Sequence, residues 1–362
     1  MASPFAALAA IAAPPPTAPL APLFANTTSL QAAVARGSFG VGYGGCGFLL
    51  FYYIGVSKVL QQLGVIKPGS TKIAATSAGM LTAGVDLGFV SHEKFLRLGK
   101  DLATGCSKQN SCAGSLDAAV VRAVQLLLPP DAAKIANGTA FFTHATPDDA
   151  TGVPLAGFVS SYASNDDLAD TIRSGAWIPV WSGPSMTRPF RGGRAMDGGF
   201  ARQYPCPEGV SYCLTVAVVP PIDWVDLTAR LLAEPESLKA IAGATGSTLG
   251  TEPKKFVDNV LLPLRGLNLT TEEVIGGVVA YLRGVSPSKE VSIWPGKYAK
   301  LPCSAWEWIV KVLMPPSAEE VDSIVALGAA DATGWAREQG LLPALPAPVP
   351  AAPSSSPRRA AA

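Results

Sequence analysis

The chain is poor in histidine and in charge. Only two of its 362 residues are histidine, and charged residues make up 15% against 48% hydrophobic residues. The formal net charge is +1 and no basic patch stands out, so we expect no nucleic-acid partner, because such a site needs clustered lysine and arginine to neutralise phosphates. The six cysteines form no CxxC pair, and with so few histidines the sequence predicts no metal site.

The sequence also lacks an uninterrupted apolar run long enough to cross a bilayer, so we predict no membrane-spanning helix. Residues 1–35 carry no charged side chain and are rich in Ala and Pro, which is typical of a disordered extension or a targeting segment. Residues 343–362 are rich in Pro, Ala and Ser and are expected to be a disordered tail. Between them we expect a catalytic domain over 36–225 and a helical region over 226–342 packed on it.

Strand-like and helix-like segments alternate along much of the chain. Short apolar runs bounded by turn residues predict strands at 38–42, 72–76, 154–162 and 212–219. Helices are expected at 49–63, 78–87, 91–102, 116–128, 166–174, 226–242, 253–262, 271–284 and 304–313. This alternation predicts an α/β layered fold with a mostly parallel sheet.

A glycine-rich turn, Gly42-Tyr-Gly-Gly-Cys-Gly47, follows the first predicted strand. It matches GxGxxG, but no Asp or Glu occurs between Gly47 and Asp86 to hold a ribose, and no P-loop lysine follows. The favoured interpretation is an oxyanion hole, in which backbone N–H groups at a helix amino end stabilise a negative oxygen. We assign Gly44, Gly45, Cys46 and Gly47 to it; a strand-to-helix turn without a ligand is the alternative.

The segment Ala75-Thr-Ser-Ala-Gly79 lies between a predicted strand and a predicted helix. This is the setting of a nucleophile elbow, where small residues two positions before and after the Ser allow a sharp turn. Ser77 is therefore the candidate nucleophile, with Ala75 and Gly79 as elbow residues. A helix start capped by Ser77 is the alternative interpretation.

Asp197 is the best candidate for a base that activates Ser77. His92, expected at the surface of a charged helix, and His144 lack neighbours typical of a triad, and both precede the plausible acids. Asp197-Gly198-Gly199 instead offers a carboxylate followed by a loop that another backbone or a substrate can approach closely. The sequence thus favours a Ser77–Asp197 dyad over a triad, although an Asp-Gly turn is also frequent without any function.

In their set, order and spacing, these motifs resemble the patatin-like phospholipase family, and most closely its adiponutrin and adipose triglyceride lipase branch. The likeness spans roughly residues 38–220 and is carried by Tyr43-Gly-Gly-Cys-Gly-Phe-Leu-Leu-Phe-Tyr-Tyr-Ile-Gly-Val56, Ala75–Gly79, Ser174-Gly-Ala-Trp-Ile-Pro-Val-Trp-Ser-Gly183 and Asp197–Gly199. The resemblance implies a three-layer α/β/α fold and a Ser–Asp dyad that forms an acyl-enzyme without His, metal or cofactor. Leu50 and Ala75 stand where the family has Gly.

The resemblance further implies a triacylglycerol lipase or phospholipase A type of enzyme in lipid catabolism, which meets its glycerolipid substrate at a membrane or lipid-droplet surface. Because of Leu50 and Ala75, a catalytically weak lipid-binding or droplet-surface protein is an alternative, as is an acyltransferase that uses the same dyad. The expected compartment is the cytoplasm with membrane or droplet association, or a plastid if residues 1–35 are a transit peptide. In an oxidising compartment, Cys106 with Cys112 or Cys206 with Cys213 are candidate disulfides.

Overall fold

The computed structural model describes residues 28–148, 150, 154–179, 181–221, 291–303 and 305–343. Seven strands form one mixed sheet: β1 (Phe39–Tyr43), β2 (Lys72–Ala75), β3 (Ala140–Thr146), β4 (Leu155–Val159), β5 (Arg188–Phe190), β6 (Gly193–Asp197) and β7 (Tyr212–Val216). The helices are α2 (Leu30–Ala35), α3 (Leu50–Gln62), α4 (Gly79–Asp86), α5 (His92–Ser107), α6 (Leu116–Leu127), α7 (Ala132–Ala136), α8 (Asn165–Gly175), α13 (Ala305–Val310) and α14 (Ala318–Glu338).

Four adjacent strands of the sheet, in the order β7-β1-β2-β3, run parallel. The antiparallel strands β4 and β6 both pair with β3, and β5 pairs with β6. The expected α/β fold with a mostly parallel central sheet is therefore confirmed. The strands β3, β5 and β6 are absent from the sequence prediction, because each is short or of mixed polarity.

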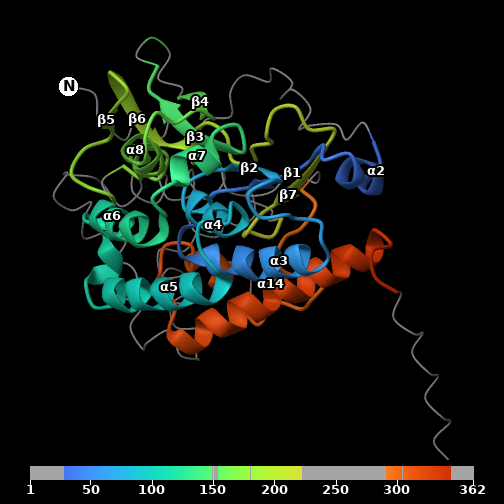
Figure 1. Ribbon diagram of the computed structural model, residues 1–362. Coiled ribbons are helices and arrows are strands. Elements are labelled where there is room, and N and C mark those ends of the chain that lie inside the picture. Colours follow the sequence, from blue (N-terminus) through green and yellow to red (C-terminus); the bar gives the residue numbers. More distant parts are fainter. Residues whose placement is uncertain are drawn as a thin grey trace, which may run out of the picture.

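Helices cover the sheet in layers. Figure 1 shows α3 and α14 lying side by side below the sheet, with α4 between them and the strands. The contact between α3 and α14 is close, because a Cβ added at Gly55 would lie 2.0 Å from the carbonyl oxygen of Val325. α8 packs against β3 and β6. These contacts form one continuous apolar core that includes residues of both the first and the last helix.

Serine residues cap the amino ends of several helices. Ser29, Ser91, Ser164 and Ser317 each accept a hydrogen bond from a backbone N–H of the first turn of α2, α5, α8 and α14. Such caps satisfy N–H groups that have no partner within the helix. In α14 the cap is a reciprocal capping box with Glu320.

The amino-terminal boundary differs from the expected one. Residues 30–35, assigned to the extension, form α2, and Leu30 and Ala33 are buried in the core. This corrects the boundary at residue 35, since a charge-free Ala-rich segment also suits a helix that buries one apolar face. The predicted helices at 226–242, 253–262 and 271–284 and the boundary at 225 lie outside the described residues.

The carboxyl-terminal part contributes to the core. Trp308 on α13 is 1% exposed, and its indole N–H donates to the carbonyl oxygen of Val218 at 2.7 Å. Trp308, in the helix expected at 304–313, is therefore part of the core. Across the described ranges, no helix combines the length and the hydropathy needed to cross a bilayer. Both candidate disulfides are formed, Cys106–Cys112 and Cys206–Cys213.

Candidate active site

Ser77 lies on a strained turn directly after β2. Its φ is +55°, in the left-handed region that residues with a Cβ rarely adopt, and it is 2% exposed. The turn is held on both sides, because the Thr76 hydroxyl lies 2.7 Å from the Thr143 hydroxyl and donates to the carbonyl oxygen of Arg202 at 3.0 Å. At the start of α4, a Cβ added at Gly79 would lie 2.7 Å from the carbonyl oxygen of Gly44. This is the geometry expected of a nucleophile elbow.

The sheet topology brings Asp197 to this turn. β2 pairs with the first half of β3 and ends at Ala75, opposite Phe142. β4 occupies one edge of β3, so β6, which pairs at His144 and Ala145, continues along the edge that β2 leaves. Asp197, the last residue of β6, therefore lies beside the elbow that follows β2.

The two side chains are hydrogen-bonded and buried. The Ser77 Oγ donates to the Asp197 Oδ2 at 2.5 Å, and the backbone N–H of Gly199 donates to the Asp197 Oδ1 at 2.8 Å. Burial raises the pKa of Asp197 to about 7, because desolvation of the carboxylate outweighs the two hydrogen bonds that lower it. A carboxyl group with a pKa near neutrality is suited to accept and return a proton.

Neither imidazole is hydrogen-bonded to this pair in the described structure, although His144 and Asp197 are cross-strand neighbours in β3 and β6. His92 is half-buried rather than at the surface, and its Nε2 lies 3.0 Å from the Ser57 hydroxyl, which donates to the buried Asp86. This corrects the expected surface position: Asp86 and Ser57 form a buried polar group to which His92 is joined. His144 packs against Phe190, with ring centroids 5.0 Å apart. Burial lowers the pKa of both imidazoles.

The four glycine-turn residues differ in what their N–H groups do. The N–H of Gly44 donates to the carbonyl oxygen of Val216 on β7 at 3.1 Å, and that of Gly45 donates to the Gln203 Oε1 at 3.3 Å. This corrects the assignment of Gly44 and Gly45 as oxyanion donors, because both N–H groups already have acceptors within the protein.

Cys46 is the N-cap and Gly47 the first residue of the short helical turn Gly47–Leu49 that leads into α3. In the described part of the chain, their N–H groups have no assigned acceptor. Gly47 has a φ of +49°, and a Cβ there would lie 2.0 Å from the carbonyl oxygen of Val312. Only glycine fits both requirements. Cys46 and Gly47 therefore remain the candidate oxyanion donors.

The two departures from the family pattern are conformationally ordinary. Ala75 is fully buried in β2, and its φ is not positive. Leu50 has a φ of −52° and a ψ of −25°, as in a helix. Neither backbone conformation requires glycine. The substitutions therefore give no structural reason to expect a disrupted site.

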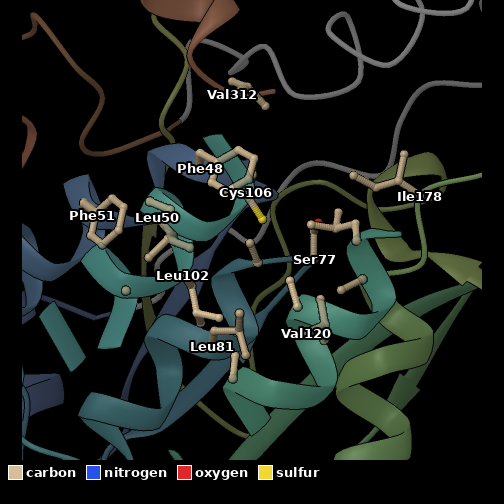
Figure 2. Close-up of a pocket in the computed structure, with 18 of the residues that line it drawn as sticks. Phe48, Leu50, Phe51, Ser77, Leu81, Leu102, Cys106, Val120, Ile178 and Val312 are labelled. Carbon is tan, nitrogen blue, oxygen red and sulfur yellow. The ribbon is translucent and has the colours of Figure 1, made fainter. Parts of the chain in front are cut away.

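An apolar pocket, partly open to solvent, lies at Ser77. Figure 2 shows Ser77 in its wall, with Leu81 and Val120 below it in this view and Phe48 and Val312 above. No charged side chain is among the described lining residues, and Ser77 supplies the only hydroxyl group. The pocket suits a hydrocarbon chain whose reactive end lies at Ser77.

Sequence reasoning missed several residues of the site. α5 and α6 line the pocket, and Thr143 and Gln203 hold the backbone around the dyad. Amphipathic periodicity predicts that these helices bury one face, but it does not tell whether that face meets the core or a cavity. Gln203 lies in a loop and carries no local signal.

Known proteins that are similar to this chain include a transacylase, a phospholipase domain-containing protein and an acyltransferase. The chain is 28% identical to the omega-hydroxyceramide transacylase of Mus musculus over 175 residues, 46% of this chain and 28% of that protein. It is 28% identical to human patatin-like phospholipase domain-containing protein 2 over 180 residues, 47% of this chain and 34% of that protein. It is 24% identical to human 1-acylglycerol-3-phosphate O-acyltransferase PNPLA3 over 177 residues, 47% of this chain and 36% of that protein.

The chain thus spans only 28–36% of the length of these curated relatives. No protein-family model matches it.

Proposed function

Because the chain belongs to the patatin-like phospholipase family, in its adiponutrin branch, we propose that it is a serine lipid acyl hydrolase with Ser77 as nucleophile and Asp197 as base. The observation that carries the proposal is the 2.5 Å hydrogen bond from the Ser77 Oγ to the Asp197 Oδ2 at an apolar pocket. Its length is that of a charge-assisted O–H···O⁻ bond. The substrate class we propose is a glycerolipid ester.

The chemistry follows from these positions. Asp197 accepts the Ser77 proton as the Oγ attacks the ester carbonyl carbon, and the N–H groups of Cys46 and Gly47 stabilise the oxygen that becomes negative. The intermediate collapses when Asp197 returns the proton to the departing alcohol, which leaves the acyl group on Ser77. Asp197 then deprotonates a water molecule that attacks this ester, and it returns the proton to the Ser77 Oγ as the bond to the acyl carbon breaks and the fatty acid is released.

The pocket supports a long acyl chain as the part of the substrate that is recognised. Its lining offers hydrocarbon contacts and no group to pair with a charged head group. Burial of each methylene from water contributes about 0.8 kcal/mol, so a long chain supplies enough binding free energy to hold the ester at Ser77. We further propose that the head group stays outside the pocket, at a membrane or lipid-droplet surface.

Acyl transfer is the second candidate, because two of the relatives are named as a transacylase and an O-acyltransferase. The same acyl-enzyme would then be attacked by an alcohol instead of water. The third interpretation is a catalytically weak lipid-binding or droplet-surface protein. The unstrained backbone at Ala75 and Leu50 removes the structural reason for it.

Turnover of lipid emulsions tests the proposal. Purified protein is incubated with triacylglycerol or phosphatidylcholine, with and without a lysolipid, beside Ser77→Ala and Asp197→Asn. Release of fatty acid that both variants abolish supports the hydrolase, and acylated lysolipid formed at its expense favours the transferase. A folded wild type that yields neither product would exclude both.

A further inference from the structure

The amide of Gln203 joins the two halves of the candidate site. Its Oε1 accepts from the backbone N–H of Gly45 at 3.3 Å, and its Nε2 donates to the carbonyl oxygen of Gly199 at 2.8 Å. Gly45 belongs to the segment that leads to the oxyanion donors, and Gly199 belongs to the loop after the base. One side chain therefore bridges the oxyanion segment and the base loop.

The two glycines make room for this amide. A Cβ added at Gly45 would lie 3.0 Å from the Gln203 Oε1 and 3.5 Å from the Ser77 Cβ, and a Cβ added at Gly199 would lie 2.4 Å from the Gln203 Nε2. The amide is thus enclosed between two residues without side chains, close to the nucleophile. Both contacts are short enough that a larger residue at either position would displace the amide.

The backbone that carries Gln203 is anchored independently of its side chain. Gln203 belongs to a segment, residues 203–207, that lies along β1, where a Cβ added at Gly42 would be 2.0 Å from the carbonyl oxygen of Pro205. The Cys206–Cys213 disulfide ties this segment to β7, in which Cys213 pairs with Gly40 of β1. Changes confined to the Gln203 side chain should therefore leave the fold intact.

A continuous series of hydrogen bonds runs through this residue. The Gly45 N–H donates to the Gln203 amide oxygen, and the Gln203 amide nitrogen donates to the Gly199 carbonyl oxygen. The Gly199 N–H in turn donates to the Asp197 Oδ1, and the Asp197 Oδ2 accepts from the Ser77 Oγ. The peptide held at Gly45 directly precedes the N–H groups of Cys46 and Gly47. The orientation of the oxyanion donors and of the base is thus coupled through one amide.

We propose that Gln203 is a positioning residue of the reaction, which holds the oxyanion segment and the base loop at a fixed separation around Ser77. This inference rests on the proposed function. Gln203 does not exchange protons with the substrate; it sets where the donors and the carboxylate point before the oxyanion forms. A group of this kind affects the transition state more than the binding of the substrate.

The test compares Gln203→Met, Gln203→Glu and a matched control, Gln31→Met. Methionine keeps the length of the side chain and removes both hydrogen bonds, whereas glutamate keeps an acceptor for the Gly45 N–H and loses the donor to Gly199. The Gln31 side chain donates to the carbonyl oxygen of Gln339 at 3.0 Å on an exposed surface far away in the chain, so its removal is a comparable loss without a link to the site. Rates are normalised to the active-site titre from a fluorophosphonate probe, so that loss of folded protein does not affect kcat.

For Gln203→Met we expect kcat to fall about tenfold to a hundredfold with KM little changed, less than the loss of a direct oxyanion donor, and Gln31→Met to match the wild type. For Gln203→Glu we expect the pH–rate profile to move to higher pH, because a second carboxylate near Asp197 disfavours its ionised form.

Unchanged kcat in Gln203→Met, or a fall in Tm alone, would overturn the inference. So would an increase in kcat, which would mean that the amide obstructs the Gly45 N–H. A wild type without any esterase activity would instead overturn the proposed function, and the positioning role with it.

Discussion

The Ser77 Oγ and the Asp197 Oδ2 are 2.5 Å apart although the residues are 120 positions apart in the chain. They meet because β6 takes over the edge of β3 where β2 ends. A short parallel strand and an antiparallel strand thus share one neighbour, and their ends deliver the nucleophile and the base to the same point. This relationship places the dyad at the rim of the parallel sheet, beside the carboxyl ends of its strands, as in other open α/β folds.

The raised pKa of Asp197, about 7, predicts the pH dependence of the reaction. Asp197 acts as a base only when ionised, so kcat/KM should rise with pH and level off above about pH 7. A pH–rate profile of ester hydrolysis from pH 5 to 9 provides the measurement. A profile that is flat over this whole range would contradict the assignment of a buried carboxylate as base.

The same carboxyl group predicts a pH-dependent stability. Because its folded-state pKa is above its unfolded value of about 3.8, the folded protein binds more protons between these values and loses stability as pH rises through this window. Asparagine does not ionise, so Asp197→Asn should gain Tm over the wild type, and more at pH 8 than at pH 5. Thermal unfolding at both pH values measures the difference in Tm. An equal gain at the two pH values would show that folding does not raise the pKa of Asp197.

The imidazoles are predicted to be dispensable. His92 is joined to Ser57 and His144 packs against Phe190, so replacing either by alanine removes no hydrogen bond to the dyad. We expect His92→Ala and His144→Ala to keep kcat within about threefold of the wild type, after correction for the folded fraction. A loss of about a thousandfold in either variant would instead point to a triad.

The shape of the pocket predicts chain-length selectivity. Ala119 on α6 lines it, whereas the neighbouring Ala118 is exposed and does not. Ala119→Leu fills part of the acyl space, so kcat/KM for a sixteen-carbon ester should fall about tenfold or more relative to a four-carbon ester. Ala118→Leu is the matched control and should leave the ratio unchanged. An identical ratio in both variants would show that the acyl chain binds elsewhere.

The disulfide between Cys206 and Cys213 should stabilise the fold modestly. It closes a loop of few residues, for which chain entropy predicts about 2–3 kcal/mol. Replacing both cysteines by serine should lower the unfolding free energy by that order, as measured by urea denaturation. Peptide mapping without reductant tests the bond itself; two free thiols at these positions in protein purified from its native compartment would contradict it.

Local motifs predicted much of the site, and long-range pairing decided the rest. Ser77, Gly79 and Asp197 were found because a sharp turn after a strand and a glycine-flanked carboxylate each leave a signal within a few residues. Gly44 was assigned wrongly because its N–H is taken by Val216, which lies on another strand. A sequence motif shows which N–H groups exist, but only the assembled sheet shows which of them are already bonded.

The same reasoning applies to the fold. Three of the four parallel strands, β1, β2 and β7, are predicted from the sequence because they are short apolar runs that are almost wholly buried. The fourth, β3, is missed because Thr and His interrupt its apolar residues. β6 is missed because Gly193 and Arg194 begin it and only its last residues are buried. That Asp197 ends a strand, and does not merely occupy a turn, follows from its pairing with β3.

Identification of the residue that a fluorophosphonate modifies is the most direct test of the Ser77–Asp197 dyad. The wild type is treated with a long-chain probe, digested and mapped by mass spectrometry, beside Ser77→Ala, Asp197→Asn and His144→Ala. We expect a single adduct on the peptide that contains Ser77, abolished in Ser77→Ala, greatly slowed in Asp197→Asn and unchanged in His144→Ala. A folded wild type that stays unlabelled, or is labelled at another residue, would contradict the Ser77–Asp197 dyad.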